Sequence, residues 1–280
     1  MTQEMWADLH VHTNCSDGIL NPETVVQNAK EAGLSAVGIV DHDTVQGIQP
    51  AETAGALYGI EVVPGVELSS QINGKEIHII GYSFNPDCPK LTNYLELFCR
   101  ERIKRAGKMI QNLNRIGVHL SMSEVEEKAK GNSIGRPHIA EVLMEKGYVE
   151  TFQEAFQKFI GYHSEAYEDK YRISPEEAIR LIFECRGLSF LAHPSPMVHE
   201  ELILNLIKSG LDGVEVVHPY VYPDRRKALE QIAREHHLLV SGGSDCHGGR
   251  DGIFTLGRWK IPFSMFEAIR EAHEAKWKNR

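Results

Sequence analysis

The chain has 280 residues, of which 42% are hydrophobic and 25% charged, and its formal net charge is −9 with histidine neutral. These values are typical of a folded globular protein and argue against a disordered or fibrous chain. The negative charge argues against broad duplex binding, which depends on many basic contacts to phosphates. No apolar run approaches the length of a membrane span, and the N-terminus lacks a secretion-signal pattern, so we expect a cytoplasmic protein with no membrane partner.

The cysteines are odd in number, and none forms a CxxC pair. This spacing argues against both a disulfide framework and a thiolate zinc cluster. We therefore expect reduced thiols at Cys15, Cys88, Cys99, Cys185 and Cys246.

Short apolar segments alternate with helix signals along most of the chain. Asn21 and Pro22 are typical of a helix start, and Gly33 marks the end of that helix. Ser174 and Glu177 form a capping box at the start of a later helix. After a first strand around His10, the expected strands are residues 36–40, 61–63, 77–80, 188–192, 214–217 and 238–240. About seven such repeats predict an α/β fold with a parallel sheet closed into a barrel.

Residues 88–170 interrupt this alternation with helical periodicity and no convincing strand. They include a long helix expected over residues 91–117 and two further capping boxes, Ser121 with Glu124 and Thr151 with Glu154. We therefore expect a barrel made of residues 1–87 and 171–280, with residues 88–170 inserted as a helical cap subdomain. Because the insertion connects consecutive strands, we expect it to lie over the strand ends and to shape a substrate pocket.

Histidines and carboxylates gather at the ends of the expected strands. His10 and His12 are two residues apart, so an extended strand points both imidazoles the same way while Leu9 and Val11 face a core. The other candidate metal ligands are Asp17, His42, Glu67, His78, His193, Asp245 and His247. In an α/β barrel the carboxyl ends of the strands form one rim, which predicts that these side chains meet.

This set of donors favours an open catalytic metal site. Imidazole and carboxylate suit manganese, zinc or iron, and the absence of thiolate ligands argues against a closed structural zinc site. The nine candidate ligands are more than one ion can coordinate when a water molecule also binds to it. We expect two or three divalent ions, with manganese preferred over zinc or iron.

The pattern resembles the PHP family, named for polymerase and histidinol phosphatase. The resemblance covers residues 1–84 and 171–280 and implies a distorted (β/α)7 barrel with a trinuclear site. It also implies that Glu67 bridges two ions, and that Asp17 stands where some relatives carry histidine. The ligand sets it implies are His10, His12, Glu67 and Asp245 for one ion, Glu67, His78 and His193 for a second, and Asp17, His42 and His247 for a third.

Three further residues are candidates for contact with the substrate. Arg136 opens a helix in the insertion, and arginine binds phosphate through two parallel hydrogen bonds, although a structural role as a cap or a pair with Glu141 is the alternative. The resemblance favours the phosphate role, because the family branch that cleaves nucleoside 3',5'-bisphosphates and short RNA carries a similar Arg-Pro-His segment. His138 and His218 are candidates for substrate contact or protonation of the leaving group, against ordinary structural roles.

Together these features predict a metal-dependent phosphoesterase. Two cations bridged by a carboxylate activate water and hold the phosphoryl oxygens for in-line attack. The resemblance implies a nucleoside 3',5'-bisphosphate or the 5' end of a short RNA as substrate; protein partners stay unknown. The alternatives are a histidinol-phosphate phosphatase and a non-catalytic, metal-stabilised module that binds nucleic acid. An amidohydrolase is disfavoured, because no lysine ends a strand where it could bridge metals.

Overall fold

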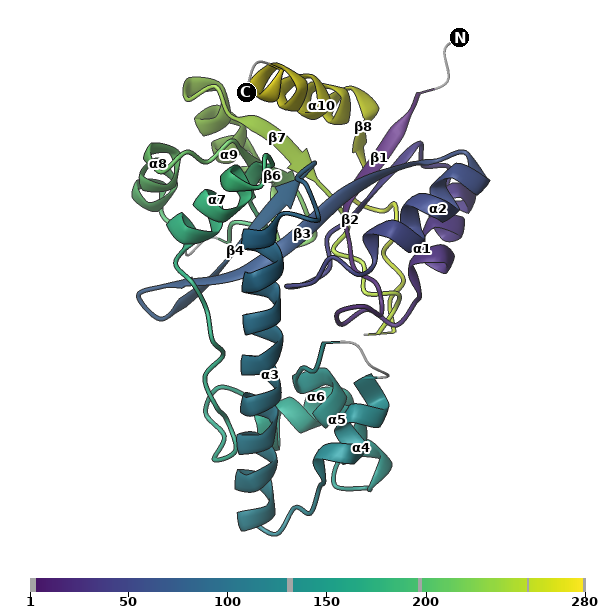
Figure 1. Cartoon of the computed structure of the whole chain (residues 1–280), viewed down its shortest axis with the longest axis vertical. Helices are drawn as coiled ribbons and strands as arrows, with labels where there is room; N and C mark the ends of the chain where they lie inside the picture. Colours follow the sequence, from purple (N-terminus) through teal and green to yellow (C-terminus); the bar gives the residue numbers. More distant parts are fainter. Residues whose placement is uncertain (1–3, 130–132, 196–197, 251, 279–280) are drawn as a thin grey trace. The chain divides into compact units, whose positions relative to one another are not determined.

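The structure is a computed structural model that describes residues 4–129, 133–195, 198–250 and 252–278. The chain divides into two compact units, Met1–Thr92 with Arg172–Arg280 (unit 1) and Asn93–Tyr171 (unit 2). Unit 1 contains every strand of the described residues, and unit 2 is helical (Figure 1).

Unit 1 is an α/β structure built on one eight-stranded sheet in the order β7-β6-β5-β4-β3-β2-β1-β8, which nearly closes into a barrel. The strands are β1 (Trp6–Val11), β2 (Ala36–Ile39), β3 (Glu61–Ile72), β4 (Lys75–Tyr82), β5 (Leu188–Leu191), β6 (Gly213–Val217), β7 (Leu239–Gly242) and β8 (Ile261–Pro262). The helices of unit 1 are α1 (Pro22–Glu31), α2 (Ile48–Tyr58), α7 (Pro175–Glu184), α8 (Glu200–Lys208), α9 (Pro223–Glu235) and α10 (Phe263–Trp277). This confirms the expected α/β barrel.

The sheet is mixed, where the sequence predicted parallel strands. β4 runs antiparallel to both β3 and β5, and β8 runs antiparallel to β1. The reason lies in the turn between β3 and β4, where Asn73 has a φ of 50° and Gly74 a φ of 76°. A two-residue Asn-Gly turn with both φ values positive produces a tight hairpin and hence an antiparallel pair.

The helix ends follow the sequence signals closely. Asn21 caps α1 by accepting a hydrogen bond from the backbone N–H of Thr24, and Ser174 with Glu177 forms the expected capping box at α7. One expectation about the cysteines is wrong, because Cys88 and Cys185 form a disulfide. The backbone N–H of Asn85 donates to the carbonyl of Cys185, which brings the segment after β4 beside the end of α7. A pairing across 97 residues leaves no local spacing signal.

Unit 2 has its own hydrophobic core. Its helices are the larger part of α3 (Pro89–Arg115), α4 (Met122–Ala129), α5 (Arg136–Glu145), α6 (Phe152–Ala155) and the π-helix η1 (Phe156–Ile160). Leu113 of α3, Val125 of α4 and Leu143 of α5 are buried together in that core. Ser121 and Glu124 form the expected capping box, whereas Thr151 caps α6 and Glu154 accepts from the backbone of Glu150 instead.

Candidate metal centre

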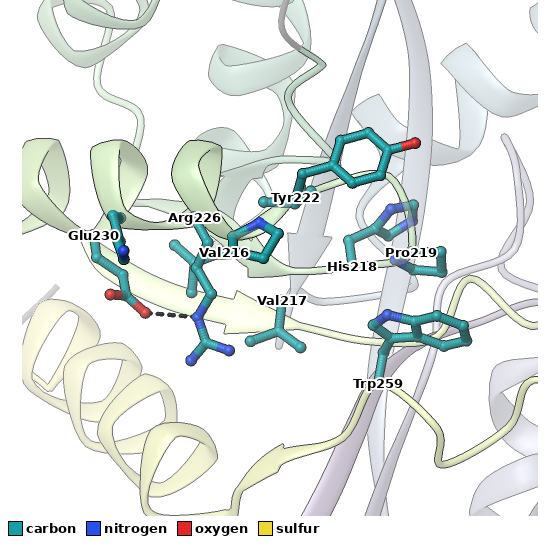
Figure 2. A pocket seen from close by; sticks show the side chains of 11 residues that line it. Val216, Val217, His218, Pro219, Tyr222, Arg226, Glu230 and Trp259 are labelled. Carbon is teal, nitrogen blue, oxygen red and sulfur yellow. Dashed lines mark hydrogen bonds and ion pairs between the residues drawn. The ribbon is translucent and has the colours of Figure 1, made fainter.

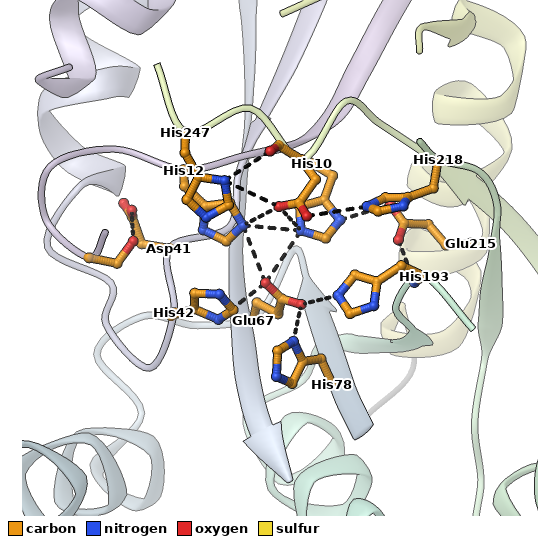
Figure 3. Close-up of polar contacts among 12 residues, drawn as sticks. His10, His12, Asp41, His42, Glu67, His78, His193, Glu215, His218 and His247 are labelled. Atoms are coloured by element: carbon orange, nitrogen blue, oxygen red, sulfur yellow. Dashed lines mark hydrogen bonds and ion pairs between the residues drawn. The ribbon is translucent and has the colours of Figure 1, made fainter. Parts of the chain in front are cut away.

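The nine expected metal ligands converge at the carboxyl end of the parallel strands of unit 1. Figure 3 shows the histidines of this set around Glu67. We call this set the rim cluster: His10, His12, Asp17, His42, Glu67, His78, His193, Asp245 and His247. β1 begins the cluster, because Leu9 and Val11 are buried in hydrophobic cores while His10 and His12, on the other face of the strand, are fully buried against polar groups.

Glu67, in the middle of β3, is the centre of the rim cluster. Its Oε2 atom lies 3.3 Å from Nε2 of both His10 and His12. Its Oε1 atom lies 2.7 Å from Nδ1 of His78 and 2.9 Å from Nε2 of His193 (Figure 3). One carboxylate oxygen therefore faces each pair of imidazoles, which is the arrangement of a ligand that bridges two cations.

Asp245 completes the group around His10 and His12. Its Oδ1 atom lies 3.0 Å from Nε2 of His12 and 3.4 Å from Nε2 of His10. Gly243 lets the segment that carries Asp245 pass close to β1, because a Cβ at position 243 would overlap the backbone nitrogen of His10. Asp245 and His193 have φ values of 50° and 26°, and such left-handed backbone in non-glycine residues concentrates at functional sites.

A third group lies on the other side of His12. A carboxylate oxygen of Asp17 lies 3.3 Å from Nε2 of His247, and its oxygens lie 3.9 Å from Nε2 of His42 and from Nδ1 of His12. His42 also faces Glu67, with its Nδ1 atom 3.2 Å from Oε2. His12 and His42 therefore each lie near both Glu67 and Asp17. The family resemblance had placed His12 with Glu67 only and His42 with Asp17 only.

The electrostatics of the rim cluster favour ionised carboxylates. Burial would raise the pKa values of Glu67 and Asp245, but the neighbouring histidines hold both well below their usual range. Burial likewise disfavours the charged form of His12, yet hydrogen bonds to Asp245 and Glu67 raise its pKa to about 10. For His42, burial dominates and lowers the pKa to about 3. The carboxylates therefore stay negative and require either protons on some imidazoles or cations nearby.

The donor set fits divalent cations. Nε2 of His10 and Nε2 of His12 are 3.1 Å apart, so the two lone pairs repel unless a proton or a cation lies between them. Two groups, His10 with His12 and Glu67, and His12 with Asp17, His42 and His247, each have ligand atoms within 4.8 Å of one another. Imidazole nitrogen and carboxylate oxygen are suited to manganese, zinc and iron.

Arg136 and His138 lie in unit 2, at the start of α5. The guanidinium of Arg136 lies 5.0 to 5.7 Å from the ring centres of Phe156, Tyr162 and Tyr167 and donates to the carbonyl of Ile160. The Nδ1 atom of buried His138 accepts from the backbone N–H of Gly135, which caps α5. Both residues therefore have local structural contacts, and a role toward substrate stays a prediction.

His218 belongs to the neighbourhood of the rim cluster, although its side chain is fully buried. Its Nε2 atom lies 3.4 Å from Oδ2 of Asp245. Sequence reasoning missed Glu215, which is 0% exposed and lies 2.9 Å from Nδ1 of His10. A signal existed, because Glu215 is the one charged residue of an apolar strand and shares its face with Gly213 and Val217.

A pocket of about 540 Å³ lies beside His218, between the end of β6, the start of α9 and the segment before β8 (Figure 2). Its walls include the rings of Tyr222 and Trp259, and Arg226 and Lys227 supply positive charge. Arg226 also pairs with Glu230 at 2.8 Å. Aromatic side chains beside cationic groups are the combination with which proteins bind single-stranded nucleic acid.

Among the described residues, no helix is both long enough and apolar enough to cross a membrane.

Comparison with known proteins agrees with this geometry. The PHP domain profile matches residues 8–234. The 5'-3' exoribonuclease Rnm of Escherichia coli is 31% identical over 247 residues, which cover 86% of this chain and 84% of that protein. A 3',5'-nucleoside bisphosphate phosphatase of Chromobacterium violaceum is 30% identical over 254 residues, which cover 87% and 89%. A crystal structure of a metal-dependent phosphoesterase from Bifidobacterium adolescentis has a TM-score of 0.88 at 30% identity and covers 94% of both chains.

Proposed function

Since this chain belongs to the PHP family and is a metal-dependent phosphoesterase, we propose that it cleaves a nucleoside 3',5'-bisphosphate or the 5' end of a short RNA. The observation that carries the proposal is the position of Glu67, with one oxygen toward His10 and His12 and the other toward His78 and His193. The similarity to an exoribonuclease and to a bisphosphate phosphatase supports the choice of substrate.

Both substrates allow the same reaction. Each carries a phosphate at the 5' position and a phosphoester at the 3' oxygen. Water adds its oxygen to the 3' phosphorus, the bond between that phosphorus and the 3' oxygen breaks, and the 3' oxygen takes a proton. The products are a nucleoside 5'-phosphate and either inorganic phosphate or an RNA shortened by one nucleotide with a new 5' phosphate.

The rim cluster would hold the ions for this step. We propose manganese, bound by His10, His12, Glu67 and Asp245, by Glu67, His78 and His193, and by Asp17, His42 and His247. When bound, divalent cations lower the pKa of coordinated water and neutralise phosphoryl oxygens. The chain itself contributes the fixed spacing, because Glu67 and His10 are buried and hydrogen-bonded before any substrate arrives.

Two features outside the rim cluster support a nucleotide as substrate. Arg136 carries the planar group that binds a phosphate through two hydrogen bonds, and the rings around it fix its guanidinium. The pocket beside His218 offers Trp259 and Tyr222 for stacking on a base, with Lys227 for a phosphate. We propose that Arg136 binds the terminal phosphate and that the pocket accepts the next nucleotide of an RNA.

A substrate comparison with the manganese-loaded protein tests the proposal. We expect rapid hydrolysis of a nucleoside 3',5'-bisphosphate and of a short 5'-phosphorylated RNA, and slow hydrolysis of histidinol phosphate. A preference for histidinol phosphate would replace the proposal with that phosphatase. A fully loaded protein that hydrolyses none of the three would indicate a binding module.

A further inference from the structure

The carboxylate of Glu215 uses both of its oxygens. Oε1 lies 2.9 Å from Nδ1 of His10, and Oε2 accepts a hydrogen bond of 2.7 Å from the backbone N–H of His193. Because an ionised carboxylate only accepts, Nδ1 of His10 must carry the proton. The neutral ring then has its lone pair on Nε2, the atom that faces His12, Glu67 and Asp245.

His218 contacts Asp245 as Glu215 contacts His10, through an atom other than the one that faces the rim cluster. The backbone N–H of Tyr220 donates to Nδ1 of His218 at 3.1 Å, so that nitrogen has the lone pair and Nε2 carries the proton. Nε2 lies 3.4 Å from Oδ2 of Asp245. This contact of Nε2 with Oδ2 leaves Oδ1, the oxygen nearest His10 and His12, to serve as a ligand.

We infer that Glu215 and His218 are positioning residues. They contact His10 and Asp245 on the side away from the rim cluster, so that Nε2 of His10 and Oδ1 of Asp245 are both directed toward one shared cation. Both come from the end of one strand, Glu215 within β6 and His218 directly after it. Outer partners of this kind fix the tautomer of a ligating histidine and raise its basicity. The inference rests on the proposed function in one respect, that the rim cluster binds divalent ions.

A separate metal site at these residues is the alternative, since ligand atoms of His10, Glu215 and His218 lie within 4.8 Å of one another. The hydrogen bonds disfavour it. A cation there would need the lone pair of Nδ1 of His10, which carries a proton toward Glu215. It would also compete with the bonds from His193 and Tyr220.

Manganese titration of the chelator-treated full chain tests the inference, with calorimetry as the readout. Glu215→Gln keeps the size of the side chain but satisfies only one of the two donors, so we expect the tightest manganese site to weaken about 10- to 100-fold. We expect His218→Gln to weaken the same site, and neither variant to weaken the site around Asp17 and His247.

Asp212→Asn is the matched control. Asp212 precedes β6 at its other end, accepts from the backbone N–H of Ser189 and pairs with Lys276, so it resembles Glu215 as a carboxylate holding a strand. We expect this variant to bind manganese as the wild type does. Thermal unfolding of each metal-free variant shows whether it folds. If Glu215→Gln does not fold, Glu215→Asp replaces it, because the shorter side chain cannot reach both donors.

The outcomes separate this inference from the proposed function. Wild-type manganese affinity in Glu215→Gln, or equal losses in Glu215→Gln and Asp212→Asn, would overturn the inference. Wild-type protein that binds manganese tightly but hydrolyses no nucleotide would overturn the proposed function and leave the inference standing.

Discussion

The rim cluster of unit 1 and the Arg136 segment of unit 2 organise charge in opposite ways. In the rim cluster, carboxylates such as Glu67 are buried and held ionised by several histidines, so cations that replace the protons of those histidines would be held by both kinds of ligand. Arg136 is a single cation fixed by three aromatic rings, which suits an anion. We therefore propose that the strand ends of unit 1 bind the metal ions and that Arg136 of the helical unit binds phosphate.

The largest expected effect concerns the rim cluster and the role of Glu67 between the two pairs of imidazoles. Glu67→Gln replaces a charged oxygen between two pairs of imidazoles with an amide nitrogen, so we expect kcat to fall by at least about a hundredfold. Circular dichroism should show an unchanged fold. Full activity in a metal-loaded Glu67→Gln protein would contradict the bridging role.

The second prediction concerns Arg136 of unit 2 and its proposed contact with phosphate. We expect Arg136→Ala to remove the proposed charge-assisted hydrogen bond to phosphate, worth roughly 1.5 kcal/mol or more, and so to raise KM for phosphorylated substrates by at least about tenfold. The measurement is steady-state kinetics with the bisphosphate. Arg115→Ala, an exposed arginine at the end of α3, is the control and should leave KM unchanged. Equal KM values for both variants would return Arg136 to a structural role.

A smaller effect is expected in the pocket beside His218. Trp259→Ala removes one stacking surface, worth about 1 kcal/mol at the lower end of base stacking, so KM for a short RNA should rise about fivefold. KM for the bisphosphate, which has no second nucleotide, should not change. Phe183→Ala, an exposed aromatic residue on α7, serves as the control. An equal rise for both substrates would exclude a subsite for the second nucleotide.

The smallest expected signal is the release of protons by the rim cluster. In the metal-free protein, carboxylates raise the pKa of His12 to about 10 and that of His78 to about 9, although burial opposes both shifts. These raised values stabilise the folded state below the ordinary pKa of 6.5, and the stabilisation is lost as pH rises through 9 and 10. Manganese must displace such protons, so its affinity should rise with pH. Calorimetry in buffers of different ionisation enthalpy counts the protons, and a pH-independent affinity without proton release would contradict this.

Much of the fold was predictable because its signals are local. Asn21, Ser174 and the apolar strands specify helix starts and the α/β alternation from neighbouring residues. The antiparallel β4 was missed although Asn73 and Gly74 mark the hairpin, because an alternating pattern suggested parallel strands throughout. The disulfide between Cys88 and Cys185 was missed because it depends on how distant segments pack.

The candidate site shows the same limit. His10, Glu67 and Asp245 were predicted as metal ligands because each lies in or just after an apolar strand, and the structure places their side chains together. Glu215 was missed because its function depends on which histidine it faces across the barrel, and only the structure places its carboxylate 2.9 Å from His10. The sequence also left His218 between substrate contact and a structural role, and its bond from Tyr220 favours an outer partner of Asp245.

The most direct test of the account is the number of manganese ions needed for hydrolysis. Chelator-treated protein is titrated with manganese while cleavage of a nucleoside 3',5'-bisphosphate and bound metal per chain are measured together. We expect little cleavage at one ion per chain and a steep rise as the second ion binds. Full activity at one ion, or none with the rim cluster saturated, would contradict a centre in which Glu67 joins two cations.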